Sequence, residues 1–178
     1  MNLTLIRRVR QVIGRIGLTL VLSLVVFSLF THLAPLTGRQ LFIIGGGSME
    51  PTIPVGSLVI ATPPDPARIA PGDVVTVRIG DGLVVTHRVT RVVDDAGGRW
   101  FQMKGDANQS ADANLVPAAS VVGSADRFIP FAGYAQTFLA TGTGLLSALA
   151  LLLALLVSYL LLEMLERSAR PTPQTAIR

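Results

Sequence analysis

The hydrophobic and polar positions of this 178-residue chain divide it into two long apolar runs with an alternating segment between them. No Asp, Glu, Lys or Arg occurs in residues 16–34, and none occurs in residues 128–162. A helix that crosses the hydrocarbon core of a bilayer needs about 20 apolar residues. The pattern therefore predicts two transmembrane helices, at 16–36 and 141–162.

The first apolar run follows four arginines, as the apolar core of a secretory signal peptide does. The apolar core of a cleaved signal peptide is usually about 7–15 residues long. Because the run at 16–34 is longer, we expect a retained membrane anchor.

The segment between the apolar runs alternates between apolar and polar residues, which is typical of β-strands with one buried face. Five stretches carry this pattern or are rich in β-branched residues: 56–62, 72–80, 82–93, 99–105 and 120–131. The turn Gly80-Asp81-Gly82 predicts a hairpin between the second and third stretches. The expected fold is mainly β, a small antiparallel β-domain at 37–135, barrel-like or sandwich-like, flanked by two transmembrane helices.

Charged residues predict how the chain is oriented in a membrane. The segments 1–15 and 163–178 together hold seven arginines and two glutamates, a net charge of +5. The middle segment has eight basic and nine acidic residues, a net charge of −1. Basic flanks stay in the cytoplasm, so we expect a cytoplasmic N-terminus, a cytoplasmic tail and an extracytoplasmic β-domain. The tail ends in "RPTPQTAIR", which we expect to be disordered. The basic residues of the middle segment do not cluster as a nucleic-acid site requires.

Candidate chemistry begins just after the first apolar run, at "GGGSMEPT", where three glycines precede Ser48. Glycine permits unusual backbone angles and close approach of another chain. A serine nucleophile needs such access, and backbone N–H groups near it can bind an oxyanion. The alternative is a flexible linker between membrane and domain, because Gly-Ser sequences have linker composition.

A general base and an acid are also available in the middle segment. Its only histidine is His87, because the other histidine of the chain, His32, lies in the first apolar run. A polar loop after the fourth predicted strand carries Asp106 and Asp112, and either could orient a histidine. Alternatively, His87 is a structural strand residue and both acids are solvated. The spacing of these side chains does not fit a metal site, and the chain has no Cys, so we expect neither metal nor cofactor.

Taken in order, these residues resemble the type I signal peptidases, in particular the branch found in archaea, the endoplasmic reticulum and some spore-forming or actinobacterial lineages. The matching stretches cover most of the middle segment: "GGSMEPT" (46–52), "PGDVVTVR" (71–78), "VVTHRV" (84–89), "MKGDANQSAD" (103–112) and "VVGSADRFIPFAGY" (121–134). Each stretch alone is a weak signal. The succession of "GSMEPT", "THRV" and "KGD" is specific.

The resemblance implies a catalytic role for residues at the matching positions. Ser48 would be the nucleophile, and His87 stands where the familiar bacterial branch has a lysine general base. The single lysine, Lys104, falls in the later "KGD" box. Position matching favours Asp112 as the acid that orients His87, and Asp106 would then support the local structure of the site.

The chain departs from the family pattern two residues before Ser48, where Gly46 replaces a serine that is common in the family. If that serine hydroxyl helps to bind the oxyanion in relatives, backbone N–H groups must do so here. The expected oxyanion hole is therefore formed by the backbone at Gly46, Gly47, Ser48 and Met49.

The function implied by the resemblance is removal of N-terminal signal peptides from exported preproteins after small residues, by a two-span serine endopeptidase of the cell membrane. Its partners would be signal peptides and the lipid bilayer, with the Sec machinery or partner subunits as further candidates. Two alternatives remain, a non-enzymatic membrane protein that displays a β binding domain and a peptidase dedicated to one or a few secreted substrates. Apolar residues near Ser48 would either touch lipid or pack in the core, namely Leu41, Phe42, Ile43, Ile44, Met49 and Ile53.

Overall fold

A computed structural model of the chain describes residues 3–80 and 82–169 and separates them into two compact units. One unit contains residues 30–138, and the other contains the described parts of 1–29 and 139–178. Asp81 of the predicted hairpin turn and the predicted disordered tail at 170–178 lie outside the described residues.

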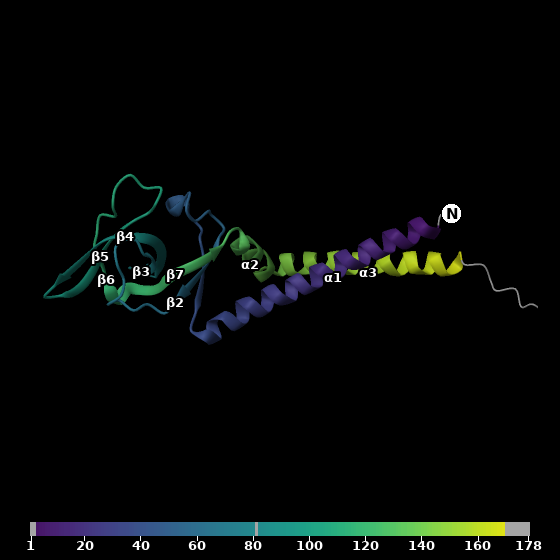
Figure 1. Ribbon diagram of the computed structural model, residues 1–178, viewed down its shortest axis with the longest axis horizontal. Helices are drawn as coiled ribbons and strands as arrows, with labels where there is room; N and C mark the ends of the chain where they lie inside the picture. The colour runs from purple at the N-terminus through teal and green to yellow at the C-terminus, as the bar shows by residue number, and fades with distance from the viewer. Residues whose placement is uncertain (1–2, 81, 170–178) are drawn as a thin grey trace, which may run out of the picture. The chain divides into compact units, whose positions relative to one another are not determined.

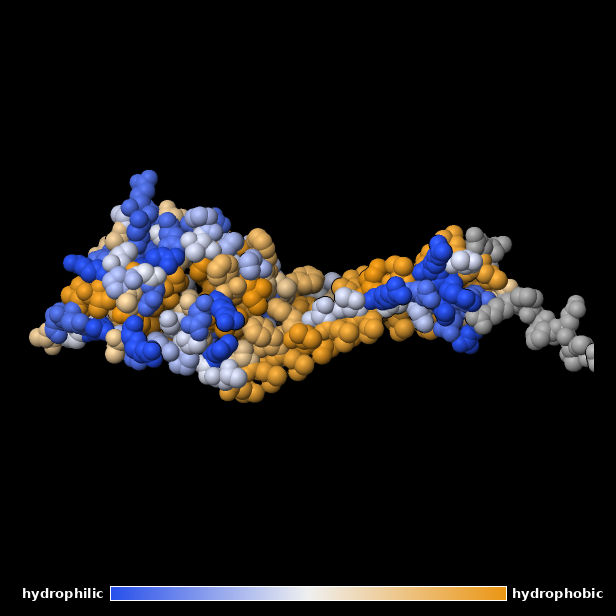
Figure 2. Space-filling model, viewed as in Figure 1, coloured by the Kyte–Doolittle hydropathy of each residue, from blue (hydrophilic) through white to orange (hydrophobic). Residues whose placement is uncertain are grey.

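The second unit is a pair of long helices, α1 (Leu3–Leu33) and α3 (Gly142–Ser168), which lie side by side (Figure 1). Both are long and apolar enough to cross a membrane, which supports a membrane location. Figure 2 shows hydrophobic surface along these helices. Beyond the predicted spans, α1 starts earlier and α3 ends later, because the flanking arginines, glutamates and leucines are good helix formers; α1 ends at Leu33, before the predicted residue 36. The bounds of the membrane spans themselves stay predictions.

Both helices have identifiable ends. After Leu33 the α1 chain tightens into the 3₁₀ turn η1 (Ala34–Thr37), which contains Pro35 and ends at Gly38. A proline disfavours α-helical geometry in the residue before it, and Gly38 adopts a positive φ of 79° that glycine accepts at low cost. The N-terminus of α3 is capped by the Thr141 hydroxyl, which accepts from the Gly144 N–H at 3.0 Å.

The first unit is built on one seven-stranded antiparallel sheet with the strand order β1-β2-β7-β3-β4-β5-β6. The predicted mainly β fold is confirmed, as one continuous sheet. Its strands are β1 (Gln40–Ile43), β2 (Leu58–Thr62), β3 (Val74–Ile79), β4 (Leu83–Asp95), β5 (Gly98–Lys104), β6 (Val116–Pro117) and β7 (Val121–Ile129). The shorter helical elements are η2 (Gly47–Met49), η3 (Ala118–Ser120) and α2 (Ala132–Ala140). The five predicted strands are β2, β3, β4, β5 and β7, whereas β1 and β6 were not predicted.

Two hydrophobic clusters form the core of this unit. The larger lies around Phe101, Met103 and Val77 and joins β3, β4, β5 and β7. The smaller contains Ile44, Met49, Ile53 and Val59, all nearly inaccessible to solvent. Three of the apolar residues near Ser48 thus pack in the core, namely Ile44, Met49 and Ile53. For these three, the alternative that they touch lipid is wrong.

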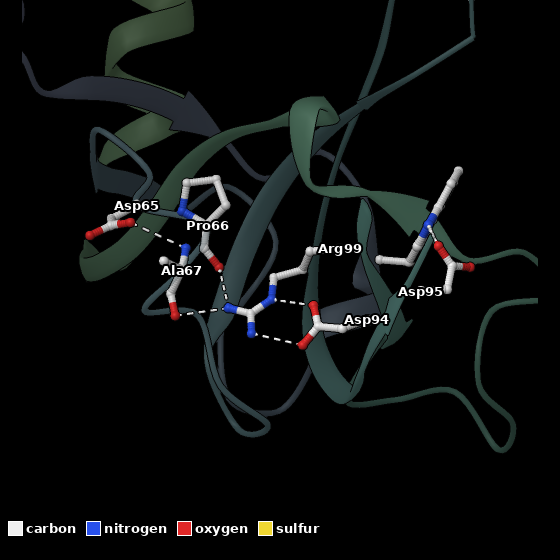
Figure 3. Close-up of polar contacts among 7 residues, drawn as sticks. Asp65, Pro66, Ala67, Asp94, Asp95 and Arg99 are labelled. Carbon is white, nitrogen blue, oxygen red and sulfur yellow. Dashed lines mark hydrogen bonds and ion pairs between the residues drawn. The ribbon is translucent and has the colours of Figure 1, made fainter. Parts of the chain in front are cut away.

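The long β4–β5 hairpin is tied to the loop that follows β2 by Arg99 (Figure 3). Its guanidinium makes two contacts with the Asp94 carboxylate, at 2.8 and 3.0 Å, and donates to the carbonyls of Pro66 and Ala67. The Asp65 side chain closes the same loop by accepting from the Ala67 N–H at 3.2 Å. His87 lies on β4 at the base of this hairpin. The contacts of Arg99 therefore help to hold His87 in position.

Candidate active site

Ser48 lies in the short 3₁₀ helix η2, which is contacted by the loop that follows β5. The Ala107 N–H donates to the Ser48 carbonyl at 2.9 Å. A Cβ placed on Gly105 would come within 2.6 Å of that carbonyl oxygen and 2.9 Å of the Ser48 Cβ. Only glycine therefore allows the two segments to approach so closely. The Ser48 side chain remains half-exposed, so its hydroxyl is accessible from outside.

His87 lies on β4 directly beside the Ser48 hydroxyl. The distance between His87 Nε2 and Ser48 Oγ is 3.0 Å, and that between His87 Nδ1 and Asp112 Oδ2 is 2.7 Å. A carboxylate at Nδ1 selects the tautomer with its proton on that nitrogen. His87 then donates to Asp112 and accepts from the Ser48 hydroxyl. Because the imidazole is only 10% exposed, its hydrogen bonds to these two residues are little disturbed by water.

Asp112 is held in place by its own backbone. Its N–H donates to the Met103 carbonyl at 2.8 Å, and its carbonyl accepts from the Gln102 side-chain amide at 2.5 Å. Both partners belong to β5, so the loop returns to the sheet at the point where its carboxylate reaches His87. Asp106, the other candidate acid, does not contact His87 by a hydrogen bond.

Asp106 is instead paired with Arg88, the residue that follows His87. The Arg88 guanidinium donates to both carboxylate oxygens, at 2.8 and 2.6 Å, and to the Gly72 carbonyl at 2.8 Å. The Arg88 hydrogen bond holds the pKa of the Asp106 carboxyl below its usual value, against the opposing effect of partial burial; a Thr52 hydrogen bond acts in the same direction as Arg88. The same pair raises the pKa of Arg88. This contact joins β4, the loop after β5 and the segment after Ser48.

A slot with strand edges on two sides opens at Ser48. Its cavity of about 290 Å³ is lined by the end of β1 and the glycines after it, and by Val84, Val85 and Thr86 of β4. Among the described residues, β1 is an edge strand of the sheet and β2 is its one partner. β4 pairs with β5 only from Arg88 onward, so residues 83–87 have β3 as their one partner strand in the described chain. Both edges therefore have backbone groups available to an extended peptide.

A second cavity, of about 360 Å³, is lined in part by His87 and Asp112. It is bordered by Arg78, Leu115 and Ser120 as well as by those two residues. Within residues 3–80 and 82–169, no group of three or more His, Cys, Asp or Glu side chains could hold a metal ion.

Comparison with known proteins gives no match to a family model, but it does give several related proteins. The catalytic subunit sec11 of the signal peptidase complex of Penicillium rubens is 29% identical over 130 residues, which cover 68% of this chain and 74% of that protein. Signal peptidase I W of Bacillus subtilis is 33% identical over 85 residues, covering 47% of this chain and 45% of the relative. The human signal peptidase complex catalytic subunit SEC11C is 32% identical over 109 residues, covering 55% of this chain and 57% of the relative.

The homologues of this chain are signal peptidases of the type I family. The predicted resemblance to the endoplasmic-reticulum-type branch is confirmed by the fungal and human relatives. The matched region spans about half the length of the Bacillus and human signal peptidases. Homology to these signal peptidases supports the interpretation that this chain is a peptidase.

Three residues whose contacts hold the candidate site together were not predicted from the sequence: Arg88, Gln102 and Gly105. One usable signal was present, since Arg88 adjoins His87 and Gly105 adjoins Asp106 in two stretches that match the family. The role of Gln102 depends on how the loop returns to β5, which no local pattern encodes.

Proposed function

We propose that this protein is a membrane-anchored serine endopeptidase that removes N-terminal signal peptides from exported preproteins. The observation that carries the proposal is the pair of hydrogen bonds linking Ser48, His87 and Asp112 beside a slot with two free strand edges. Relationship to signal peptidases supports the same substrate class.

The proposed reaction is acyl transfer in two stages. Ser48 Oγ attacks the carbonyl carbon of the last signal-peptide residue while its proton passes to His87 Nε2. The C–N bond then breaks, and His87 returns the proton to the leaving amine of the mature protein. His87 then takes a proton from water, whose oxygen attacks the ester carbonyl. The ester bond breaks, His87 returns that proton to Ser48 Oγ, and the signal peptide leaves as a carboxylic acid. Asp112 keeps the imidazole in the required tautomer and stabilises its protonated form.

The oxyanion of the intermediate would be bound by backbone N–H groups around Ser48. The first N–H groups of a helical turn have no partner inside the turn, and Ser48 and Met49 both belong to the 3₁₀ turn η2. Gly46 offers no hydroxyl at the position where relatives commonly have serine. One lost oxyanion donor can cost about 3 kcal/mol of transition-state stabilisation.

The slot fits the substrate class for two reasons. An extended peptide can add as a strand between residues 43–46 and 84–86, with main-chain hydrogen bonds that do not depend on its sequence. Apolar side chains, including Phe42, Ile44 and Met49, border a small cavity next to Ser48. Small residues at the last and third-last positions before the cut, the A-x-A pattern, would fit such a slot.

The proposed location follows from the charge pattern and the two helices. Both termini lie in the cytoplasm of a cell with the β-unit outside, at the membrane face where signal peptides emerge. Signal peptides and lipid are the proposed partners, and the Sec machinery or accessory subunits would be sought by co-purification.

Processing of an A-x-A preprotein in membranes tests the proposal. Wild-type protein should release the mature preprotein, whereas Ser48→Ala, accumulated to the same level, should not. Equal processing by the two forms would favour the non-enzymatic binding protein. Processing of one operon-linked secreted protein, with none of a panel of other preproteins, would favour a dedicated peptidase.

A further inference from the structure

The helix pair contains a groove that the proposed peptidase reaction does not use. We call it the α1–α3 groove; it is a cavity of about 650 Å³ bordered by Gln11, Gly14, Arg15, Gly17, Val21 and Leu156 among others. Its volume lies within the range of small-molecule sites. The groove lies within one compact unit, between two helices that Figure 1 shows side by side.

Two glycines of α1 create the groove. Gly14 lets the Tyr159 ring of α3 approach, since a Cβ there would lie 3.1 Å from the ring. A Cβ on Gly17 would meet nothing within 4 Å, so the space beside it is left unfilled. The floor toward Val21 is apolar, with Leu152, Leu155 and Leu156 facing it from α3.

The end of the groove nearest the chain start is cationic. Arg10 is already engaged there, at 3.2 Å from Glu166 and with its guanidinium 5.4 Å from the Tyr159 ring centroid. Arg15 is exposed and makes no hydrogen bond or ion pair within residues 3–80 and 82–169. Gln11, one turn earlier on the same face of α1, adds an amide donor beside it. A ligand with an anionic head and an apolar tail would therefore be complementary to the groove.

The length of the groove points to a lipid. From Arg10 to Val21 the helix rises about 16 Å at 1.5 Å per residue. The part from Arg15, beside which an anionic head would lie, to Val21 accounts for about 9 Å of this rise, and it fits within the hydrocarbon part of one leaflet, which is about 15 Å thick. A transmembrane helix would need a groove about twice as long. A signal peptide has a positively charged N-terminal region, which the arginines of the groove would repel.

We propose that the α1–α3 groove binds one anionic phospholipid of the leaflet that faces the N-terminus. Its phosphate accepts hydrogen bonds from Arg15 and Gln11, and one acyl chain lies over Gly17 toward Val21. The bound lipid fills the space between the two helices and so holds the anchor pair together. This inference is independent of the peptidase chemistry, since none of these residues belongs to the site at Ser48.

Native mass spectrometry of the full chain in detergent, titrated with phosphatidylglycerol or with phosphatidylcholine of the same acyl chains, tests the proposal. An arginine near an anionic lipid surface contributes enough for about a fivefold change in affinity. The wild type should bind one phosphatidylglycerol about fivefold more tightly than phosphatidylcholine, and Arg15→Gln should abolish this preference. The matched control is Arg8→Gln, because Arg8 is exposed on α1 but does not border the groove.

A second variant tests the apolar part of the site. Gly17→Leu should weaken binding of both lipids, because a Cβ at this position meets nothing within 4 Å and the longer side chain would extend into the groove. Equal affinity of the wild type for the two lipids, or the same loss in Arg8→Gln as in Arg15→Gln, would overturn the proposal. So would a polypeptide captured by a photocrosslinker on Gly17→Cys, which is a single labelling site in a chain without Cys.

Discussion

The contact between Arg88 and Asp106 gives the most informative test of how the site is held together. Two hydrogen bonds of 2.8 and 2.6 Å join the two side chains, and the Asp106 carboxylate is 15% exposed. Replacing Asp106 with Asn keeps the size and one acceptor but removes the charge. A hydrogen bond to a charged group contributes about 1.5–3 kcal/mol, and Arg88 keeps its bond to the Gly72 carbonyl and some solvent contact. We therefore expect Asp106→Asn to lower the free energy of unfolding by about 2 kcal/mol at neutral pH.

The loss should depend on pH in a defined direction. Arg88 lowers the pKa of Asp106 in the folded protein, relative to about 3.9 in an unfolded chain. A carboxyl with a lowered folded pKa stabilises the protein above its unfolded pKa, and this contribution is lost as the pH falls through the folded pKa. The difference between wild type and Asp106→Asn should therefore be complete at pH 7 and should shrink below about pH 4.

Denaturant unfolding of the full chain in detergent, measured at pH 7 and at pH 3, would give the loss of unfolding free energy at each pH. The matched control is Asp94→Asn, because Asp94 is held by Arg99 in a similar fork, at 2.8 and 3.0 Å, but is 61% exposed. Exposed ion pairs contribute little, so this control should change stability much less. The reasoning is refuted if the two variants lose equal stability at pH 7, or if the Asp106→Asn deficit is undiminished at pH 3.

Three further predictions concern the site itself. Asp112→Asn should leave the fold intact and lower kcat by up to about 10⁴-fold, because the imidazole loses its tautomer control; a smaller loss than that of Asp106→Asn in the same cleavage assay would contradict the assignment. Gly105→Ala should reduce both cleavage and the unfolding midpoint, since its Cβ would lie 2.6 Å from the Ser48 carbonyl; wild-type values in both measurements would show that the loop yields freely. Gly46→Ser should fold normally, because a Cβ there meets nothing within 4 Å, and it should raise kcat if a hydroxyl at this position binds the oxyanion; an unchanged kcat would show that backbone N–H groups suffice.

The sequence predicted the parts of the fold that depend on repeated local patterns. Alternating apolar residues marked the longer strands, and the Gly80-Asp81-Gly82 turn marked the β3–β4 hairpin, whose strands pair as far as Ile79 and Leu83. β1 was missed because "QLFI" starts a short apolar run without alternation, and its strand geometry comes from pairing with β2. β6 has only two residues, too few for any period.

The candidate site was predictable as a set of residue types but not as a geometry. Spacing alone left Asp106 and Asp112 both able to serve His87. The choice between them depends on long-range contacts: Arg88 pairs with Asp106, while Met103 and Gln102 hold the backbone of Asp112. Such contacts form only when the loop returns to the sheet, and no repeating pattern in the sequence predicts them.

The central claim is that Ser48 cleaves signal peptides, and one measurement addresses it directly. Purified wild-type protein and Ser48→Ala, each in vesicles of defined lipid, would be incubated with an A-x-A preprotein and with a variant that has a bulky residue at the last signal position. Mass spectrometry would then locate the new N-terminus. We predict a single cut after the A-x-A site by the wild type, none by Ser48→Ala, and little with the bulky variant. The same cut made by Ser48→Ala would contradict the account.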